Sequence, residues 1–362
     1  MKAPEFWGRQ AKPVERPLLW ALAPLSLVFR AAGALRRLLA RPARAGVPVL
    51  CVGNLTAGGA GKTPTALAIA ARLRERGRRP HVVLRGYGGS VKGPVLVDPI
   101  AHRAEQVGDE ALLIARRLPT WVARDRAAGA RAAAAAGADV VILDDGFQNP
   151  SIEKDLSLIV VDGGYGFGNG RVIPAGPMRE PLARGLARAD GVVVVGEDTI
   201  DVAAALPFER PVLRAVTVPG PETRRLRNRK VVAFAGIGRP EKFFDTLRTI
   251  GCRIAGSWSF PDHHPYDPDE IARLVEVAHR MDAVLVTTEK DLVRLPPEAR
   301  DLVDHLTISL EWLDADPLDR LLDRIDPRRP EPATPAGLSR LIDGRAGHED
   351  GTGHEDGTGR RR

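Results

Sequence analysis

The fold is decided by the stretch VPVLCVGNLTAGGAGKTP, which covers residues 47–64. Its apolar first part predicts a buried strand over 47–52, and an Ala-rich helix is predicted to follow over 62–76. The turn between them is rich in glycine, which lets backbone N–H groups point at phosphate oxygens, and the helix N-terminus adds its positive end. The stretch therefore predicts a phosphate-binding loop (P-loop) with a nucleoside triphosphate as its ligand.

Each residue type in this loop has a predicted role. Lys62 is expected to reach the β- and γ-phosphates of ATP, and the Thr63 hydroxyl is expected to bind Mg²⁺. The strict motif has glycine at position 56, where this chain has threonine, and the flexibility is left to Gly58 and Gly59. A chance glycine turn is the alternative, which the flanking strand and helix disfavour. The predicted nucleotide-binding residues are Thr56, Ala57, Gly58, Gly59, Ala60, Gly61, Lys62 and Thr63.

Strand and helix patterns alternate beyond the loop. Short, continuous apolar runs at 81–84, 140–143, 158–161 and 192–195 are typical of parallel strands buried on both faces, and helices are predicted over 106–118 and 125–136. This predicts an α/β fold, with a P-loop NTPase-like α/β/α core over 46–220 whose ligands lie at the carboxyl ends of the strands. A second βα series predicts a smaller C-terminal α/β domain over 225–328.

Two carboxylates follow the predicted strand at 140–143. Asp144 and Asp145 come directly after this apolar run, where a P-loop protein places the carboxylate that holds Mg²⁺ or its water shell. A pair of Asp residues in an ordinary strand-to-turn connection is the alternative. The P-loop upstream favours the metal-binding role.

The basic character of the chain is local. The net charge is +7, and the first 45 residues, with nine Lys or Arg against two Glu, account for all of it. The remainder is neutral, so a nucleic-acid surface spread over the protein is disfavoured. Two cysteines cannot form a disulfide framework, which fits a reducing cytoplasm.

The N-terminal region, residues 1–45, is predicted to be a basic amphipathic helix. Its longest apolar run, 18–29, is shorter than the roughly 20 residues that cross a bilayer, so no span is expected. Leu25, Val28, Ala32, Leu35 and Leu39 recur at helical spacing, with arginines on the opposite side. Such a helix could lie on an anionic membrane surface, or it could pack on the protein with a solvated basic face.

Several further segments carry chemistry only in combination. The sequence Gly108-Asp109-Glu110 could cap a helix, PDHH at 261–264 could be a turn or half of a metal site, and Arg179 follows a Gly/Pro-rich loop that could close over an anion. The sequence GHEDGT is repeated in a tail at 343–362 that is expected to be disordered.

Taken in order, the motifs resemble those of the tetraacyldisaccharide 4′-kinase family of lipid A biosynthesis. The resemblance extends from the basic N-terminal helix to about residue 325, and only the repeat tail departs from it. The motifs are NLTAGGAGKTP (54–64), RGYGG (85–89), VGDE (107–110), LDDGFQ (143–148), GNGRVIPAGPMREP (168–181), AGIGRPEKFF (235–244), PDHH (261–264) and TTEKDLVR (287–294).

The resemblance implies transfer of the ATP γ-phosphoryl group to the 4′-hydroxyl of tetraacyldisaccharide 1-phosphate, which forms lipid IVA. It implies that Asp109 is the base, that His263 pairs with it, and that Arg179 neutralises phosphate charge. His264, adjacent to His263, is the other candidate for the pairing. Metal ligands are expected among Thr63, Glu110, Asp144 and Asp145, and ATP and Mg²⁺ are the expected cofactors.

The resemblance also implies a peripheral enzyme at the cytoplasmic face of the inner membrane. A lipid disaccharide substrate and an anionic membrane surface are its expected partners, with no nucleic acid and no inferred protein partner. Two other function classes compete with this one. A P-loop kinase or ligase could act on a soluble metabolite, and a nucleotide switch could use the same loop, although no NKxD guanine-reading motif is found.

Overall fold

The strand that precedes the glycine-rich turn is β1 (Val49–Gly53), and it lies in the middle of a nine-stranded sheet. The structure is a computed structural model that describes residues 4–9, 16–206 and 210–326, and the chain up to Ile325 forms one compact unit. The strand order is β13-β8-β7-β6-β1-β5-β2-β4-β3. All neighbours from β8 to β4 run parallel, and the two edge strands β3 and β13 are antiparallel to theirs.

The other strands of this sheet are β2 (Pro80–Leu84), β3 (Val95–Leu96), β4 (Thr120–Val122), β5 (Val140–Asp144), β6 (Leu156–Asp162), β7 (Gly191–Val195), β8 (Val212–Pro219) and β13 (Ile308–Trp312). β1 pairs with β5 on one side and with β6 on the other. The chain therefore winds in both directions away from β1, and the carboxyl ends of these three strands meet at the switch point where such sheets bind ligands.

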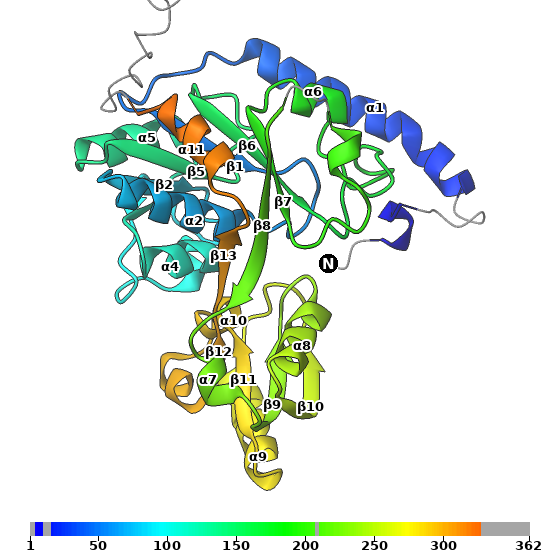
Figure 1. The fold of residues 1–362 in the computed structure, drawn as a ribbon, viewed down its shortest axis with the longest axis vertical. Coiled ribbons are helices and arrows are strands. Elements are labelled where there is room, and N and C mark those ends of the chain that lie inside the picture. The colour runs from blue at the N-terminus through cyan, green and yellow to red at the C-terminus, as the bar shows by residue number, and fades with distance from the viewer. Residues whose placement is uncertain (1–3, 10–15, 207–209, 327–362) are drawn as a thin grey trace, which may run out of the picture. The chain divides into compact units, whose positions relative to one another are not determined.

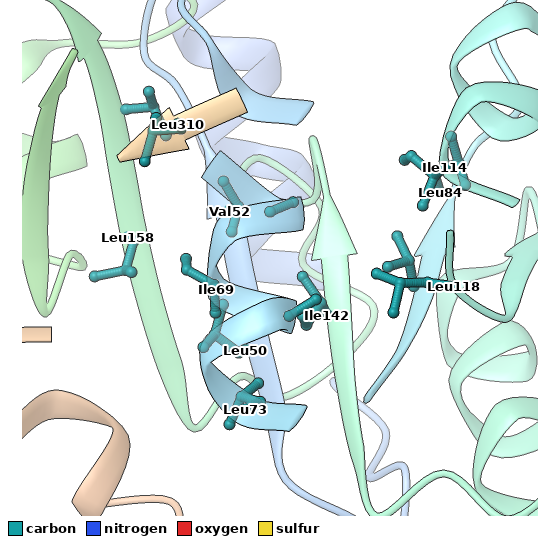
Figure 2. Packing of buried hydrophobic residues seen from close by; sticks show 14 of the residues in the cluster. Leu50, Val52, Ile69, Leu73, Leu84, Ile114, Leu118, Ile142, Leu158 and Leu310 are labelled. Atoms are coloured by element: carbon teal, nitrogen blue, oxygen red, sulfur yellow. The ribbon is translucent and has the colours of Figure 1, made fainter. Parts of the chain in front are cut away.

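Apolar side chains cover both faces of this sheet. On one face Leu50, Val52 and Ile142 pack against Ile69 and Leu73 of α2 (Lys62–Glu75), as Figure 2 shows. α4 (Asp109–Ala115) and α11 (Asp316–Asp323) add to the same cluster. The opposite face packs against α5 (Arg126–Ala135) and α6 (Leu182–Leu186). The fold is the predicted α/β/α sandwich.

A second sheet has four parallel strands in the order β10-β9-β11-β12. Its strands are β9 (Lys230–Ala235), β10 (Arg253–Ser259), β11 (Val284–Thr288) and β12 (Asp304–Leu306). Two apolar clusters cover its faces, one of which includes α9 (Pro268–Arg280) and the other α8 (Pro240–Thr249). The short elements α7 (Thr223–Leu226), α10 (Glu289–Leu292) and η4 (Pro297–Leu302) complete this part, and η3 (Ala203–Ala205) precedes β8.

Strands β8 and β13 lie side by side and lead from the larger sheet towards the smaller one (Figure 1). After β12 the chain returns through β13, and Leu318, Leu321 and Leu322 of α11 pack into the core of the larger sheet. The end of the range expected for the smaller domain, 225–328, thus belongs to the larger sheet. The apolar face of the amphipathic helix α11 packs against that sheet, beside α2.

The helix expected over 106–118 is two helices. α3 (Ala104–Val107) ends at Gly108, whose φ of +88° breaks the helical path, and α4 starts at Asp109. A Cβ atom at position 108 would lie 2.5 Å from the carbonyl oxygen of Tyr87, so the close approach requires glycine. The break turns Asp109 out of a regular helix and into the first turn of a new one.

The N-terminal helix α1 (Arg16–Leu39) is 24 residues long and runs through Pro24 without ending. By length and composition alone its segment Pro17–Leu39 is long and apolar enough to cross a membrane, although the uninterrupted apolar run at 18–29 is shorter and no span was expected. A 3-10 turn, η1 (Glu5–Trp7), precedes it. The expected disordered tail at 343–362 lies outside the described residues.

One face of α1 contacts the protein and the other is exposed. Leu19 is buried, Ser26 donates a hydrogen bond to the carbonyl of Val172, and Arg37 forms an ion pair with Glu180. The residues of the predicted apolar face lie on the exposed side, together with further large apolar side chains. The exposed residues are Leu18, Trp20, Leu25, Leu27, Val28, Phe29, Leu35, Leu38 and Leu39.

Candidate functional site

The P-loop spans the turn from β1 to α2. Gly58 and Gly61 both have positive φ, and Gly61 is the residue before the first turn of α2. The loop is also fixed from outside, because the N–H of Ala57 donates to the carbonyl of Pro177 at 2.7 Å and Thr56 bridges to Met178. The loop predicted to bind phosphate is therefore in direct contact with the Gly/Pro-rich loop at 168–181.

Asp144, at the end of β5, lies against the start of α2. The Thr63 hydroxyl donates a hydrogen bond to its Oδ2 at 2.9 Å, and the carboxylate is buried. Burial raises the pKa of Asp144 to about 7, helped by the charges of Glu110 and Asp145 and opposed by that of Lys62. Its Oδ1 is buried without a hydrogen-bond partner among the described residues.

One carboxylate oxygen of Asp145 lies close to two cationic side chains. Its Oδ1 lies 2.8 Å from Nη1 of Arg179 and 3.8 Å from Nζ of Lys62. Burial alone would raise the pKa of Asp145, but the charges of Lys62 and Arg179 lower it below its usual value. The structure thus brings Lys62, Arg179 and Asp145 together at the end of β5.

Asp109 meets His263 across the two sheets. Nδ1 of His263 lies 3.0 Å from Oδ2 of Asp109, which is buried in the first turn of α4. His263 itself belongs to the turn after β10, and its φ is +60°, a backbone conformation that few side chains adopt. Tyr87 packs its ring 5.6 Å from the imidazole, centroid to centroid.

His264 faces elsewhere. Its Nε2 contacts Glu270 at 3.0 Å, and its ring stacks on Phe260. The adjacent histidines therefore have different environments, and His263 is the one beside Asp109.

Two cations from the TTEKDLVR segment also face Asp109. Lys290 Nζ lies 3.9 Å from its Oδ2 and 3.4 Å from Glu110, and Arg294 Nε lies 3.7 Å from the same Oδ2. Burial would raise the pKa of Asp109, but the hydrogen bond with His263 and these positive charges lower it below its usual value. Asp109 is thus held as a carboxylate.

The donor set fits a magnesium ion bound together with a nucleotide. In the described residues no three His, Cys, Asp or Glu side chains form a preformed metal cluster. Mg²⁺ does not need one, because it is usually bound by one or two carboxylates with the remaining positions taken by water and phosphate oxygens. The unpartnered Oδ1 of Asp144, beside the Thr63 hydroxyl, offers oxygen ligands of this kind.

Four further polar residues of the site lie in the family motifs, although the motifs alone indicated no role for them: Lys290, Arg294, Gln148 and Glu180. Gln148 donates to the carbonyl of Asn54 at 2.8 Å and receives a hydrogen bond from Arg179 at 3.4 Å. Glu180 is buried and contacts Arg188 as well as Arg37 of α1. The position of a polar residue inside a motif is a signal that it has a role in the site, but only the fold shows which residue it contacts.

A P-loop at the switch point of a parallel sheet, with a carboxylate at the end of the neighbouring strand and an Asp–His pair beside them, defines a phosphotransferase of the P-loop class. A family model for "Tetraacyldisaccharide-1-P 4'-kinase" matches residues 18–326. The chain belongs to the tetraacyldisaccharide-1-P 4′-kinase family.

Relatives cover nearly the whole described chain. The tetraacyldisaccharide 4′-kinase of Rhodospirillum centenum is 56% identical over 325 residues, which are 89% of this chain and 96% of that protein. That of Rhodospirillum rubrum is 51% identical over 90% of this chain and 98% of its own length. A crystal structure of an "apo" form of LpxK from Aquifex aeolicus in complex with ATP matches with a TM-score of 0.70 and 27% identity, over 85% of this chain and 99% of that one.

Proposed function

We propose that the protein transfers the γ-phosphoryl group of ATP to the 4′-hydroxyl of tetraacyldisaccharide 1-phosphate, which yields lipid IVA for lipid A. Membership of the family and relatives of this name at more than 50% identity support the reaction. The observation that carries the mechanism is the 3.0 Å contact between Asp109 and His263, which joins a carboxylate of the larger sheet to a side chain of the smaller one.

The nucleotide is held by the P-loop. Its backbone N–H groups and the start of α2 bind the phosphates, and Lys62 lies on the same side of the loop as Asp145. Thr63 and Asp144 would hold Mg²⁺, with Glu110 and Asp145 nearby, and the ion would supply charge neutralisation on the phosphates when bound. Lys62 turns from Asp145 to the phosphates when ATP binds.

Asp109 is the general base. Its pKa is lowered by its neighbours, so at neutral pH the carboxylate is ionised and can accept the proton of the sugar hydroxyl as the oxygen attacks the γ-phosphorus. His263 orients this carboxylate through one of its oxygens and leaves the other for the acceptor. Among the described residues, Oδ1 of Asp109 receives only the N–H of the next residue, Glu110, at 2.9 Å.

Arg179 serves the transferred phosphoryl group. It sits on the Gly/Pro-rich loop, whose backbone is bonded to the P-loop at Ala57 and at Leu55. Its guanidinium lies 2.8 Å from Oδ1 of Asp145. Arginine forms forked hydrogen bonds with phosphate oxygens, so this residue neutralises the charge that moves to the acceptor side.

The acceptor approaches from the membrane. The exposed apolar face of α1 supports insertion into the surface of the cytoplasmic leaflet, while its opposite face stays on the protein through Ser26 and Arg37. A mostly apolar cavity of about 350 Å³ lies between α1 and the Gly/Pro-rich loop, with Arg30 and Arg171 in its lining. This arrangement suits a lipid with an anionic headgroup that remains in the bilayer.

The activity is tested with labelled ATP and the disaccharide 1-phosphate lipid in detergent micelles. Label is expected on the sugar, and Asp109→Ala is expected to lower kcat at least about 100-fold while nucleotide binding is retained. Asp98→Ala, at an exposed loop carboxylate, serves as the matched control. Transfer of label to a water-soluble acceptor instead of the lipid, or normal turnover by Asp109→Ala, would contradict the proposal.

A further inference from the structure

The guanidinium of Arg294 lies buried between the Asp109–His263 pair and the core of the smaller sheet. Only 5% of its side chain is exposed. Its Nη2 donates to the carbonyl of Gly236 at 2.9 Å and its Nη1 to the carbonyl of His264 at 3.3 Å. The Arg294 side chain thus binds two backbone carbonyls next to His263, that of Gly236 and that of His264.

The Gly236 carbonyl is shared with His263. The backbone N–H of His263 donates to this oxygen at 3.1 Å, which is the same atom that Arg294 contacts. His263 is in the left-handed region with φ +60°, so its conformation persists only where surrounding contacts maintain it. The two hydrogen bonds from Arg294 to Gly236 and His264 supply such contacts.

Asp291 fixes the position of the Arg294 guanidinium. It is fully buried and accepts hydrogen bonds from the guanidinium, from the hydroxyl of Tyr266 at 2.8 Å and from the N–H of Gly236 at 2.9 Å. Arg294 is therefore fixed before any substrate binds. Its Nε donates to the carbonyl of Lys290 at 3.2 Å and lies 3.7 Å from Oδ2 of Asp109, the oxygen that His263 also contacts.

We propose that Arg294 is a positioning residue that sets His263 against Asp109 and so aligns the base for phosphoryl transfer. The inference rests on the roles proposed above for Asp109 and His263. Arg294 acts through these two residues, because its remaining hydrogen bonds go to backbone carbonyls and to Asp291.

The chain offers a matched control in Arg300. It belongs to the same part of the protein and also donates two hydrogen bonds to carbonyls, those of Leu295 and Val293, both at 3.1 Å. Within the part of the chain that the structure describes, none of its hydrogen bonds reaches the His263 turn or Asp109. Replacing Arg300 therefore removes a comparable structural support without disturbing the pair.

The test is a double-mutant cycle on kcat with the lipid acceptor. Arg294→Lys keeps the charge but cannot hold two carbonyls and a carboxylate at once, so kcat is expected to fall about tenfold or more while KM for ATP changes less than about twofold. In a His263→Ala background the same substitution is expected to change kcat less than about twofold, because the residue it positions is absent. Arg300→Lys is expected to leave kcat close to that of the unaltered enzyme in both backgrounds.

Equal losses from Arg294→Lys in both backgrounds would overturn the inference and leave the proposed function intact. A His263→Ala enzyme with undiminished kcat would overturn the proposed pairing, and the inference with it. If Arg294→Lys does not fold, a second experiment replaces it. The Nε–H resonance of Arg294 is then compared in ¹⁵N spectra of the unaltered and the Asp109→Asn enzyme. That resonance is expected to shift while that of Arg300 does not, and an unchanged Arg294 resonance would overturn the inference.

Discussion

The hydroxyl of Thr63 donates a 2.9 Å hydrogen bond to Asp144, which joins the start of α2 to the end of β5. The other oxygen of Asp144 is buried with no partner among the described residues, and burial raises the pKa of this carboxyl to about 7. A divalent cation would stabilise the ionised carboxylate and use the free oxygen. The pair is therefore the expected centre of the magnesium site.

Replacement of Thr63 is expected to weaken Mg²⁺ binding selectively. Thr63→Ala removes one oxygen ligand, so the Mg²⁺ concentration for half-maximal turnover is expected to rise about tenfold or more. Thr63→Ser keeps the hydroxyl and is expected to behave like the unaltered enzyme. The measurement is a Mg²⁺ titration of turnover, with nucleotide binding in EDTA as a check on the loop. An unchanged midpoint for Thr63→Ala would exclude this residue as a ligand.

Arg179 is expected to matter for the chemical step. Its guanidinium lies 2.8 Å from Asp145, next to Lys62, where a transferred phosphoryl group would accumulate charge. Arg179→Gln is expected to lower kcat about 100-fold with a much smaller change in KM for ATP. Arg184, exposed on α6, provides a matched control. The idea fails if Arg184→Gln and Arg179→Gln lower kcat equally.

The local parts of the site were predictable from the sequence. The P-loop needs only a strand, a glycine-rich turn and a helix in succession, and Asp144 and Asp145 follow a single apolar strand. The pairing of Asp109 with His263 was expected only from the resemblance to the family. No periodicity or spacing indicates that two residues 154 positions apart will meet.

Lys290 and Arg294 show why the remainder could not be predicted. Lys290 is in the short helix α10 and Arg294 is in the turn that follows it, where a solvated charge is the ordinary interpretation, and only the packing of the smaller sheet brings both to Asp109. The break at Gly108 was missed for a different reason. Val107 and Ala111 continue a helical apolar pattern across it, while the positive φ of Gly108 and its close approach to the carbonyl of Tyr87 are features of the fold.

Negative charges introduced on the exposed apolar face of α1 are expected to weaken binding of the protein to membranes. Trp20 is 73% exposed and Val28 65%, and neither residue is in the lining of the cavity between α1 and the Gly/Pro-rich loop. Trp20→Glu with Val28→Glu is expected to reduce sedimentation with anionic vesicles at least about tenfold. Turnover of a soluble acceptor analogue is expected to persist, because the substitutions change the exposed face of α1 and leave that cavity intact.

The control for this experiment is Ile100→Glu, at a side chain that is 94% exposed on a loop of the larger sheet. It adds one negative charge to the surface without touching α1. Deletion of residues 1–40 should weaken vesicle binding further. Unchanged sedimentation after either the double substitution or the deletion would refute the anchoring role of α1.

Cys51 is expected to be inert to thiol reagents in the folded protein. It lies fully buried in β1, and burial raises the pKa of its thiol to about 12, with the charge of Lys154 opposing the shift. Alkylation at pH 8 is expected to require unfolding, so the denatured protein should react at least about 100-fold faster. Mass spectrometry of the modified peptide distinguishes Cys51 from Cys252. Rapid modification of Cys51 in the native protein would show that β1 opens easily.

Asp319 is expected to make stability depend on pH in the acid range. It joins α11 to α2 through Arg72 and Arg76, and the hydrogen bond from Arg72, followed by that from Arg76, lowers its pKa below the ordinary 3.8. A carboxyl with a depressed pKa in the folded state stabilises that state above its unfolded pKa and loses this contribution as the pH falls through the folded value. Asp319→Asn is therefore expected to lower the free energy of unfolding by about 1 kcal/mol at pH 7.

The difference between Asp319→Asn and the unaltered protein should shrink as the pH falls from 3.8 through the lower pKa of the folded state, below which both proteins carry a neutral side chain at this position. Urea unfolding at a series of pH values measures it. Asp245→Asn, in the exposed Asp245–Arg248 pair of α8, is the matched control and is expected to change stability less at every pH. A difference for Asp319→Asn that stays constant down to pH values near 2 would mean that its effect on stability does not come from the charge of Asp319.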